Sequence, residues 1–227
     1  MNLKMKIVPL EFSIVVVGED CNPTILNPDF LKYQQIVPEE WEWELAAAPL
    51  TTRGISVVAY TSGIMLKVEP NRFQVTEVNQ CSDITDSKAI SIARRYVEVL
   101  PHVKYTAVGT NFRGFSQIEN PNEFLKARFI KPGPWDQQPL DLKAVTLSFA
   151  YAHEDARLTL ALEGRVILHQ QEEQTQQIFG VDISGNYHRE CHGYPTNDMV
   201  LAHIAKAKSD AAHFGTMADE LLFAGAS

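Results

Sequence analysis

FLKYQQIVPEEW, at residues 30–41, returns later in the chain as FLKARFIKPGPW, at residues 124–135. The offset is 94 residues (124 minus 30), and six of the twelve positions are identical. Average residue usage gives roughly one match in twelve by chance. The matches include Trp41 and Trp135, and because tryptophan is rare, the pair indicates a duplicated unit.

The resemblance continues in order on both sides of these stretches. Asn27-Pro28 precedes the first stretch and Asn120-Pro121 precedes the second, while Ala59-Tyr60 returns as Ala150-Tyr151. Offsets that drift by a few residues are typical of small loop insertions, and a period near 94 is far longer than that of solenoid repeats. The sequence therefore predicts an internal duplication.

Each half is predicted to hold antiparallel strands followed by a helix. In the first half we expect strands at 12–17, 55–60, 64–69 and 72–78, and a helix from about 87 to 99. In the second half we expect strands at 104–117, 145–151, 158–162, 165–169 and 179–183, and a helix from 197 to about 214. The continuous apolar run 12–17 predicts burial on both faces of the sheet.

The expected fold class is α+β, because hairpins dominate and helices follow groups of strands. The first half is assigned to residues 1–102 and the second to 103–227, with an extra strand and loop near 178–195. Neither half has enough helix to cover its sheet twice. We therefore expect the halves to pack with pseudo-twofold symmetry as one cooperative domain.

Several smaller features complete this prediction. Thr85 or Asp86 is expected to cap the first long helix. Thr196 is expected to cap the second one, and Gly215 to end it. Trp41 and Trp135 each follow a proline by three residues and are predicted to be buried core anchors.

The composition of the chain limits the partners and the cellular location that we expect. The 227 residues carry a net charge of −8, which disfavours nucleic acids and anionic membrane surfaces as partners. Three widely spaced cysteines, Cys21, Cys81 and Cys191, offer no disulfide framework and suggest free thiols in a cytoplasmic protein. No apolar run reaches the roughly 18 residues of a membrane span.

One dense polar cluster could carry chemistry. It contains Asp182, His188, Glu190, Cys191 and His192. Imidazole and thiolate can bind zinc together, and a Cys–His pair can form a nucleophile. The spacing matches no familiar ligand pattern, and a solvated loop explains the same residues. No metal and no cofactor are predicted.

A basic group is the candidate binding site. Lys126, Arg128 and Lys131 stand near Trp135, and such a grouping can bind a single nucleic-acid strand by phosphate contacts and stacking. With the acidic net charge, a solvated basic face is the better interpretation.

Two further sets of polar residues have simple structural explanations. His203 and Asp210 are seven residues apart and share a helix face, where a packing histidine is expected. His153-Glu154-Asp155 is predicted to be a hairpin tip.

Two functions follow from these patterns. The first is a non-enzymatic binding or interaction protein, because a duplicated scaffold offers edge strands and grooves to a protein or peptide. The alternative is a hydrolase or metal-dependent enzyme that uses the segment Asp182–His192. The sequence favours the first, and a homo-oligomer is compatible with it.

Overall fold

The computed structural model describes residues 7–78, 87–137, 139, 141–171, 174–192 and 196–224. Its centre is one antiparallel sheet of nine strands in the order β2-β3-β4-β5-β1-β6-β9-β8-β7. The mixed α+β class with an antiparallel sheet is thus confirmed. None of the described helices is long and apolar enough to cross a membrane.

The strands before the middle of the chain are β1 (Val8–Glu19), β2 (Leu50–Thr51), β3 (Ser56–Ala59), β4 (Ile64–Glu69) and β5 (Arg72–Val78). The later strands are β6 (Lys104–Gln117), β7 (Thr146–His153), β8 (Ala156–Gln171) and β9 (Gln174–Glu190). The α-helices are α1 (Pro28–Tyr33), α2 (Lys88–Val99), α3 (Pro121–Phe129), α4 (Asn197–Ala205) and α5 (Ala207–Phe223).

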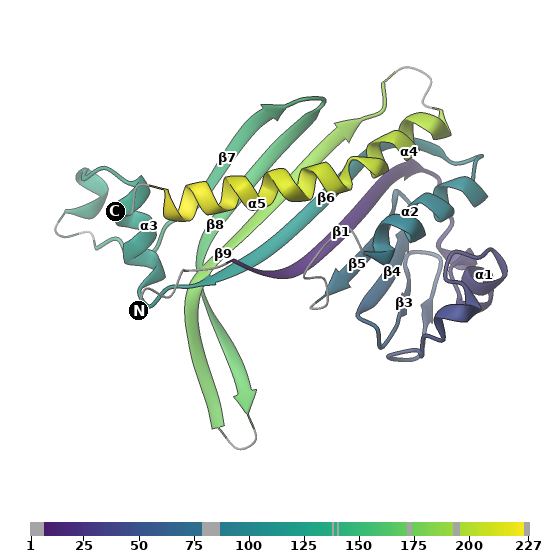
Figure 1. The fold of residues 1–227 in the computed structure, drawn as a ribbon, viewed down its shortest axis with the longest axis horizontal. Helices are drawn as coiled ribbons and strands as arrows, with labels where there is room; N and C mark the ends of the chain where they lie inside the picture. The colour runs from purple at the N-terminus through teal and green to yellow at the C-terminus, as the bar shows by residue number, and fades with distance from the viewer. Residues whose placement is uncertain are drawn as a thin grey trace.

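Helices α2, α4 and α5 lie across one face of the sheet (Figure 1). On β1, Phe12, Ile14 and Val16 point to this helix-covered face and are buried. Val15 and Val17 point to the opposite face, called here the open face, and are only partly buried. The expectation that this strand is buried on both faces is therefore wrong, because helices cover one face of the sheet.

Aromatic contacts fix the helices on the covered face. Tyr96 of α2 stacks on Phe73 of β5, with ring centroids 3.7 Å apart. Phe214 of α5 stacks on Phe112 of β6, with centroids 5.4 Å apart. Because aromatic rings bury large apolar areas, these pairs anchor one helix to each half of the sheet.

Strand β8 differs from its prediction. Residues 158–162 and 165–169 were expected as two strands, but they form one continuous strand of 16 residues. Beyond Glu163, which pairs with Thr146 at the start of β7, β8 pairs only with β9. The two-stranded extension, Val166–Gln171 with Gln174–Phe179, projects from the sheet and is called here the arm (Figure 1).

The remaining second-half elements differ at their ends. Residues 178–190, expected as an extra strand and loop, belong to β9, which pairs with β6 over Gly180–Glu190. The final helix breaks at Lys206, whose backbone N–H bonds to His203 O at 3.1 Å, and continues to Phe223. Gly215 does not end it, because burial of Ala218 and Leu222 outweighs the roughly 1 kcal/mol helix penalty of one glycine.

The helix caps are partly as expected. Thr196 caps α4 by accepting a hydrogen bond from the backbone of Met199 at 3.3 Å, as predicted. The cap of α2 is Ser87, which accepts from the backbone N–H of Ala89 at 3.1 Å. Thr85 and Asp86, the residues expected to cap it, lie outside the described residues.

The expectation of two buried tryptophans is wrong. Trp135 is 51% exposed, and Trp41 is only partly buried. Each lies in a short 3-10 helix, Pro134–Asp136 and Glu39–Trp41 respectively. Within the repeated stretch 124–135, the buried side chain is Leu125 of α3, and the indole of Trp135 lies against the backbone of Gly133 instead.

Candidate functional site

The polar segment Asp182–His192 is mostly a strand. Asp182, His188 and Glu190 point to the open face of β9, whereas Cys191 is buried among the core residues. Six residues of strand separate Asp182 from His188, which is roughly 20 Å at 3.3 Å per residue. The segment therefore does not bring its acid, imidazole and thiol groups to one point.

Each of these side chains has a local partner. Arg113 donates two hydrogen bonds from Nε to the carboxylate of Asp182, at 2.8 and 3.1 Å, and Arg165 Nε lies 3.4 Å away. His188 Nε2 and Glu190 Oε1 are 2.7 Å apart, and this hydrogen bond lowers the pKa of Glu190.

These pairs stabilise the surface of the sheet. Within the described ranges, no three His, Cys, Asp or Glu side chains are placed to hold a metal ion. Burial raises the pKa of the Cys191 thiol, which makes it a weak nucleophile at neutral pH. Cys21 is likewise free and buried, while Cys81 lies outside the described residues.

The expected basic site is dispersed. Arg128 donates to the carbonyl oxygens of Glu220, at 3.2 Å, and Ala224, at 2.6 Å, and also bonds Leu221. A cation at a helix C-terminus satisfies its free carbonyls, so Arg128 caps α5.

The two lysines of this group differ in their surroundings. Lys126 pairs with Asp136 at 3.2 Å, which raises the pKa of Lys126. Lys131 is exposed. Lys126, Arg128 and Lys131 thus do not form one basic surface.

A buried charge network lies under α5, and the sequence pattern revealed only part of it. Arg189 of β9 and Asp210 of α5 are each 1% exposed and form an ion pair. Arg189 also donates to Asp155, at the turn between β7 and β8, at 2.7 Å. His203 of α4 lies 3.6 Å from the same carboxylate, and burial lowers the pKa of His203. Full burial and mutual pairing indicate a structural role in docking α4 and α5.

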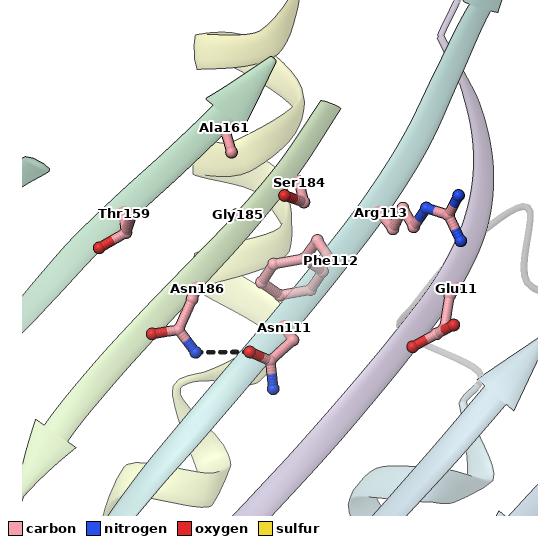
Figure 2. A pocket seen from close by; sticks show the side chains of 9 residues that line it. All are labelled: Glu11, Asn111, Phe112, Arg113, Thr159, Ala161, Ser184, Gly185 and Asn186. Carbon is pink, nitrogen blue, oxygen red and sulfur yellow. Dashed lines mark hydrogen bonds between the residues drawn. The ribbon is translucent and has the colours of Figure 1, made fainter. Parts of the chain in front are cut away.

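The open face has a shallow hollow of about 230 Å³ over β1, β6, β9 and β8 (Figure 2). Asn186 Nδ2 donates a hydrogen bond to Asn111 Oδ1 across neighbouring strands, and Thr159, Ala161 and Ser184 are the small side chains beside them. Amides and hydroxyls of this kind bind polar groups, and Glu11 and Arg113 also line the hollow. The guanidinium of Arg113 is already paired with Asp182.

The outer edge of β7 is a more distinctive feature. Strand β7 is last in the sheet order and pairs only with β8 among the described strands. Its eight residues, TLSFAYAH, contain no proline and no Asp, Glu, Lys or Arg. At the opposite edge, β2 has only two residues. Natural sheets protect their edges with short strands, charges or proline, so β2 is protected and β7 is not.

Exposed apolar side chains lie on the arm, beyond the end of β7. Val166, Leu168 and Phe179 lie on the arm and are 48%, 65% and 41% exposed. Val166 and Phe179 are direct cross-strand partners. An isolated two-stranded hairpin is marginal in water, so an arm with uncovered apolar side chains suits contact with another molecule.

Comparisons of this chain with protein families, with curated proteins and with solved structures find no match.

Proposed function

We propose that this protein is a non-enzymatic binding protein that adds an extended polypeptide segment to the outer edge of β7. The observation that carries the proposal is the unprotected edge of eight residues. Its outward backbone N–H and C=O groups are a template for one further strand.

The occupant is a neutral, extended segment of another polypeptide. Thr146–His153 contains no Asp, Glu, Lys or Arg, so the edge presents no permanently charged side chain that would favour a charged partner. On the open face, Thr146, Ser148, Ala150 and Ala152 are small or short and exposed, and they leave the partner's side chains room. The adjacent arm adds Val166 and Leu168 as apolar contacts.

We further propose that the scaffold arose by duplication of a unit of strand, helix, three strands and helix. Two observations support this. The sheet order places β1 and β6 side by side at the centre, with β5-β4-β3 outward from one and β9-β8-β7 outward from the other. Trp41 and Trp135 each occupy a 3-10 helix that follows a short α-helix. In this proposal β7 occupies the position of β3, but β3 is covered by β2 and β7 is not.

A strand-forming peptide tests the binding proposal directly. The probe is a fluorescein-labelled peptide of alternating valine and threonine with a lysine at each end, and binding is measured by fluorescence anisotropy. We expect saturable binding that is lost in Ala150→Lys, because a lysine on an edge strand opposes further pairing. The matched control is Ser91→Lys, an exposed position on α2 that adds the same charge away from the edge.

N-methylation of the peptide backbone distinguishes strand addition from non-specific binding. N-methylation of every second amide of the probe should abolish binding when it blocks the amides that face β7. Methylation of the other set should leave binding intact. Equal binding by both methylated peptides contradicts the proposal, as does unchanged binding to Ala150→Lys. A dimer of the protein that Ala150→Lys dissociates would assign the edge to a second copy and would also overturn it.

A further inference from the structure

A separate hollow, of about 510 Å³, lies beyond the opposite half of the sheet, beside β3. Its apolar wall, called here the aromatic groove, consists of Pro28, Val37, Pro38, Trp43, Leu45 and Tyr60. The wall is held by backbone pairing, because Leu45 forms a β-bridge with Tyr60 and Glu44 accepts from the backbone of Thr61 at 2.9 Å. The groove is therefore built on the sheet rather than on a free loop.

The aromatic rings of this region form a short stack. Trp43 lies 5.6 Å from Tyr60 and 4.6 Å from Trp41, measured between ring centroids. Lys88 of α2 places its ammonium 5.4 Å from the ring centroid of Trp41. The stack thus already holds one cation through Trp41, and Trp43 lines the groove.

Tyr60 contributes a phenol side chain to the groove. Its side chain lines the groove, the residue is 7% exposed, and burial raises the pKa of Tyr60 to about 12. The hydroxyl therefore stays protonated at neutral pH. No hydrogen bond joins it to any other described residue. A phenol hydroxyl can both donate and accept a hydrogen bond, so it can bond a polar group placed in the groove.

The rim of the groove is acidic. Glu39, Glu40 and Glu42 line it, and Lys32 forms an ion pair with Glu39 at 2.6 Å. Within the described part of the chain, Glu40 and Glu42 form no ion pair. Two free carboxylates above aromatic rings create a local negative field at a surface where apolar groups can also be buried.

We propose that the aromatic groove binds an arginine side chain presented by a partner polypeptide. A guanidinium is planar and weakly hydrated, so it can stack on Trp43 while it donates to Glu40, to Glu42 and to the hydroxyl oxygen of Tyr60. The prolines and Leu45 accept the aliphatic part of that side chain. This site lies beyond the other half of the sheet from β7, so it goes beyond the proposed function and does not depend on it.

The first experiment compares three probes. Blocked pentapeptides with a central arginine, lysine or citrulline are titrated against tryptophan fluorescence at low salt. We expect binding in the order arginine, lysine, citrulline, with citrulline about tenfold weaker than arginine, because it keeps the shape and loses the charge. Equal binding of the arginine and citrulline peptides overturns the proposal. Tighter binding of spermine than of the arginine peptide would assign the groove to a small polyamine and would also overturn it.

Two variants locate the site. Glu40→Gln combined with Glu42→Gln keeps the shape of the rim and should weaken the arginine peptide about tenfold. Tyr60→Phe should weaken it a few fold by removing the hydroxyl oxygen. The control is Glu220→Gln, an exposed carboxylate on α5, which should leave binding unchanged. Because all three variants keep near-native side-chain volumes, equal thermal midpoints will show that they fold. Unchanged affinity in the double variant contradicts the proposal, whatever happens at the β7 edge.

Discussion

Arg189 and Asp210 form a two-point ion pair that joins β9 to α5. Arg189 donates from its two terminal nitrogens to Oδ2 and Oδ1 of Asp210, at 2.7 and 2.8 Å. Thr110 of β6 donates to Oδ2 at 2.6 Å, so the carboxylate bridges two central strands and a helix. Burial opposes the charge on Arg189, but its bonds to Asp210 and Asp155 raise its pKa overall.

Removing one partner of this ion pair should strongly destabilise the folded protein. Asp210→Asn leaves the buried guanidinium without its countercharge, and we expect a loss of about 3–5 kcal/mol in the free energy of unfolding. Asp155→Asn, at a half-exposed carboxylate, should cost less than about 1 kcal/mol. Urea unfolding measures both. Similar losses of unfolding free energy in the two variants would show that the buried ion pair stabilises the protein no more than the half-exposed one does.

Two glycines offer a second matched comparison. A Cβ at Gly185 would lie 2.6 Å from Cδ2 of Phe214 and 3.1 Å from Cδ2 of Leu160. Gly185→Ala should therefore destabilise by about 1–3 kcal/mol through overpacking.

Gly215 is the control for that substitution. It lies inside α5, and an added Cβ there meets no atom within 4 Å. Gly215→Ala should stabilise the protein by about 1 kcal/mol, because alanine favours helix. Thermal unfolding of both variants checks the opposite signs, and a stabilising Gly185→Ala would contradict the close contact between α5 and β9.

The two repeated tryptophans should differ in their effect on stability. Trp135 is half exposed, so Trp135→Ala should cost less than about 1 kcal/mol. Trp41 stacks on Trp43 and holds Lys88, so Trp41→Ala should cost about 1–2 kcal/mol. Chemical denaturation of the two variants decides the order, and a larger loss for Trp135→Ala would restore the view that it anchors the core.

Stability should fall in mild acid because of histidines beside α5. His213 stacks on His153 with ring centroids 3.8 Å apart and is hydrogen-bonded to Tyr187. Burial, and then the charge of His153, lower the pKa of His213, although Asp210, Glu154 and Glu220 oppose this. The folded pKa thus lies below the unfolded value of about 6.5.

The sign of the pH effect on stability follows because the pKa of His213 is lower in the folded state than in the unfolded state. Above about pH 6.5 the histidine is neutral in both states and the full stability is present. As the pH falls through the unfolded pKa and then the folded one, the unfolded chain binds the proton first, so stability is lost. His213→Gln should flatten this dependence in urea titrations between roughly pH 7 and 5. An unchanged pH slope in His213→Gln would assign the loss to other groups, such as His203.

Local patterns in the sequence determined most of the secondary structure. Alternating residues predicted β7, and the strands expected at 55–60 and 64–69 form the hairpin of β3 and β4. Apolar spacing along 88–99 predicted α2. These predictions succeed because a strand or helix buries one face. The apolar residues of that face therefore recur along the sequence with the period of the strand or of the helix.

What only the tertiary structure decided concerns residues far apart in the chain. The pairing of Arg189 with Asp210, the cap that Arg128 provides to α5, and the exposure of Trp135 each depend on which elements pack together. Burial and charge pairing act across space, and a pattern of adjacent residues does not encode the distance between β9 and α5. The sequence by itself determined the α+β class and its antiparallel strands, while the order of the strands in the sheet decided that β7 lies at an edge.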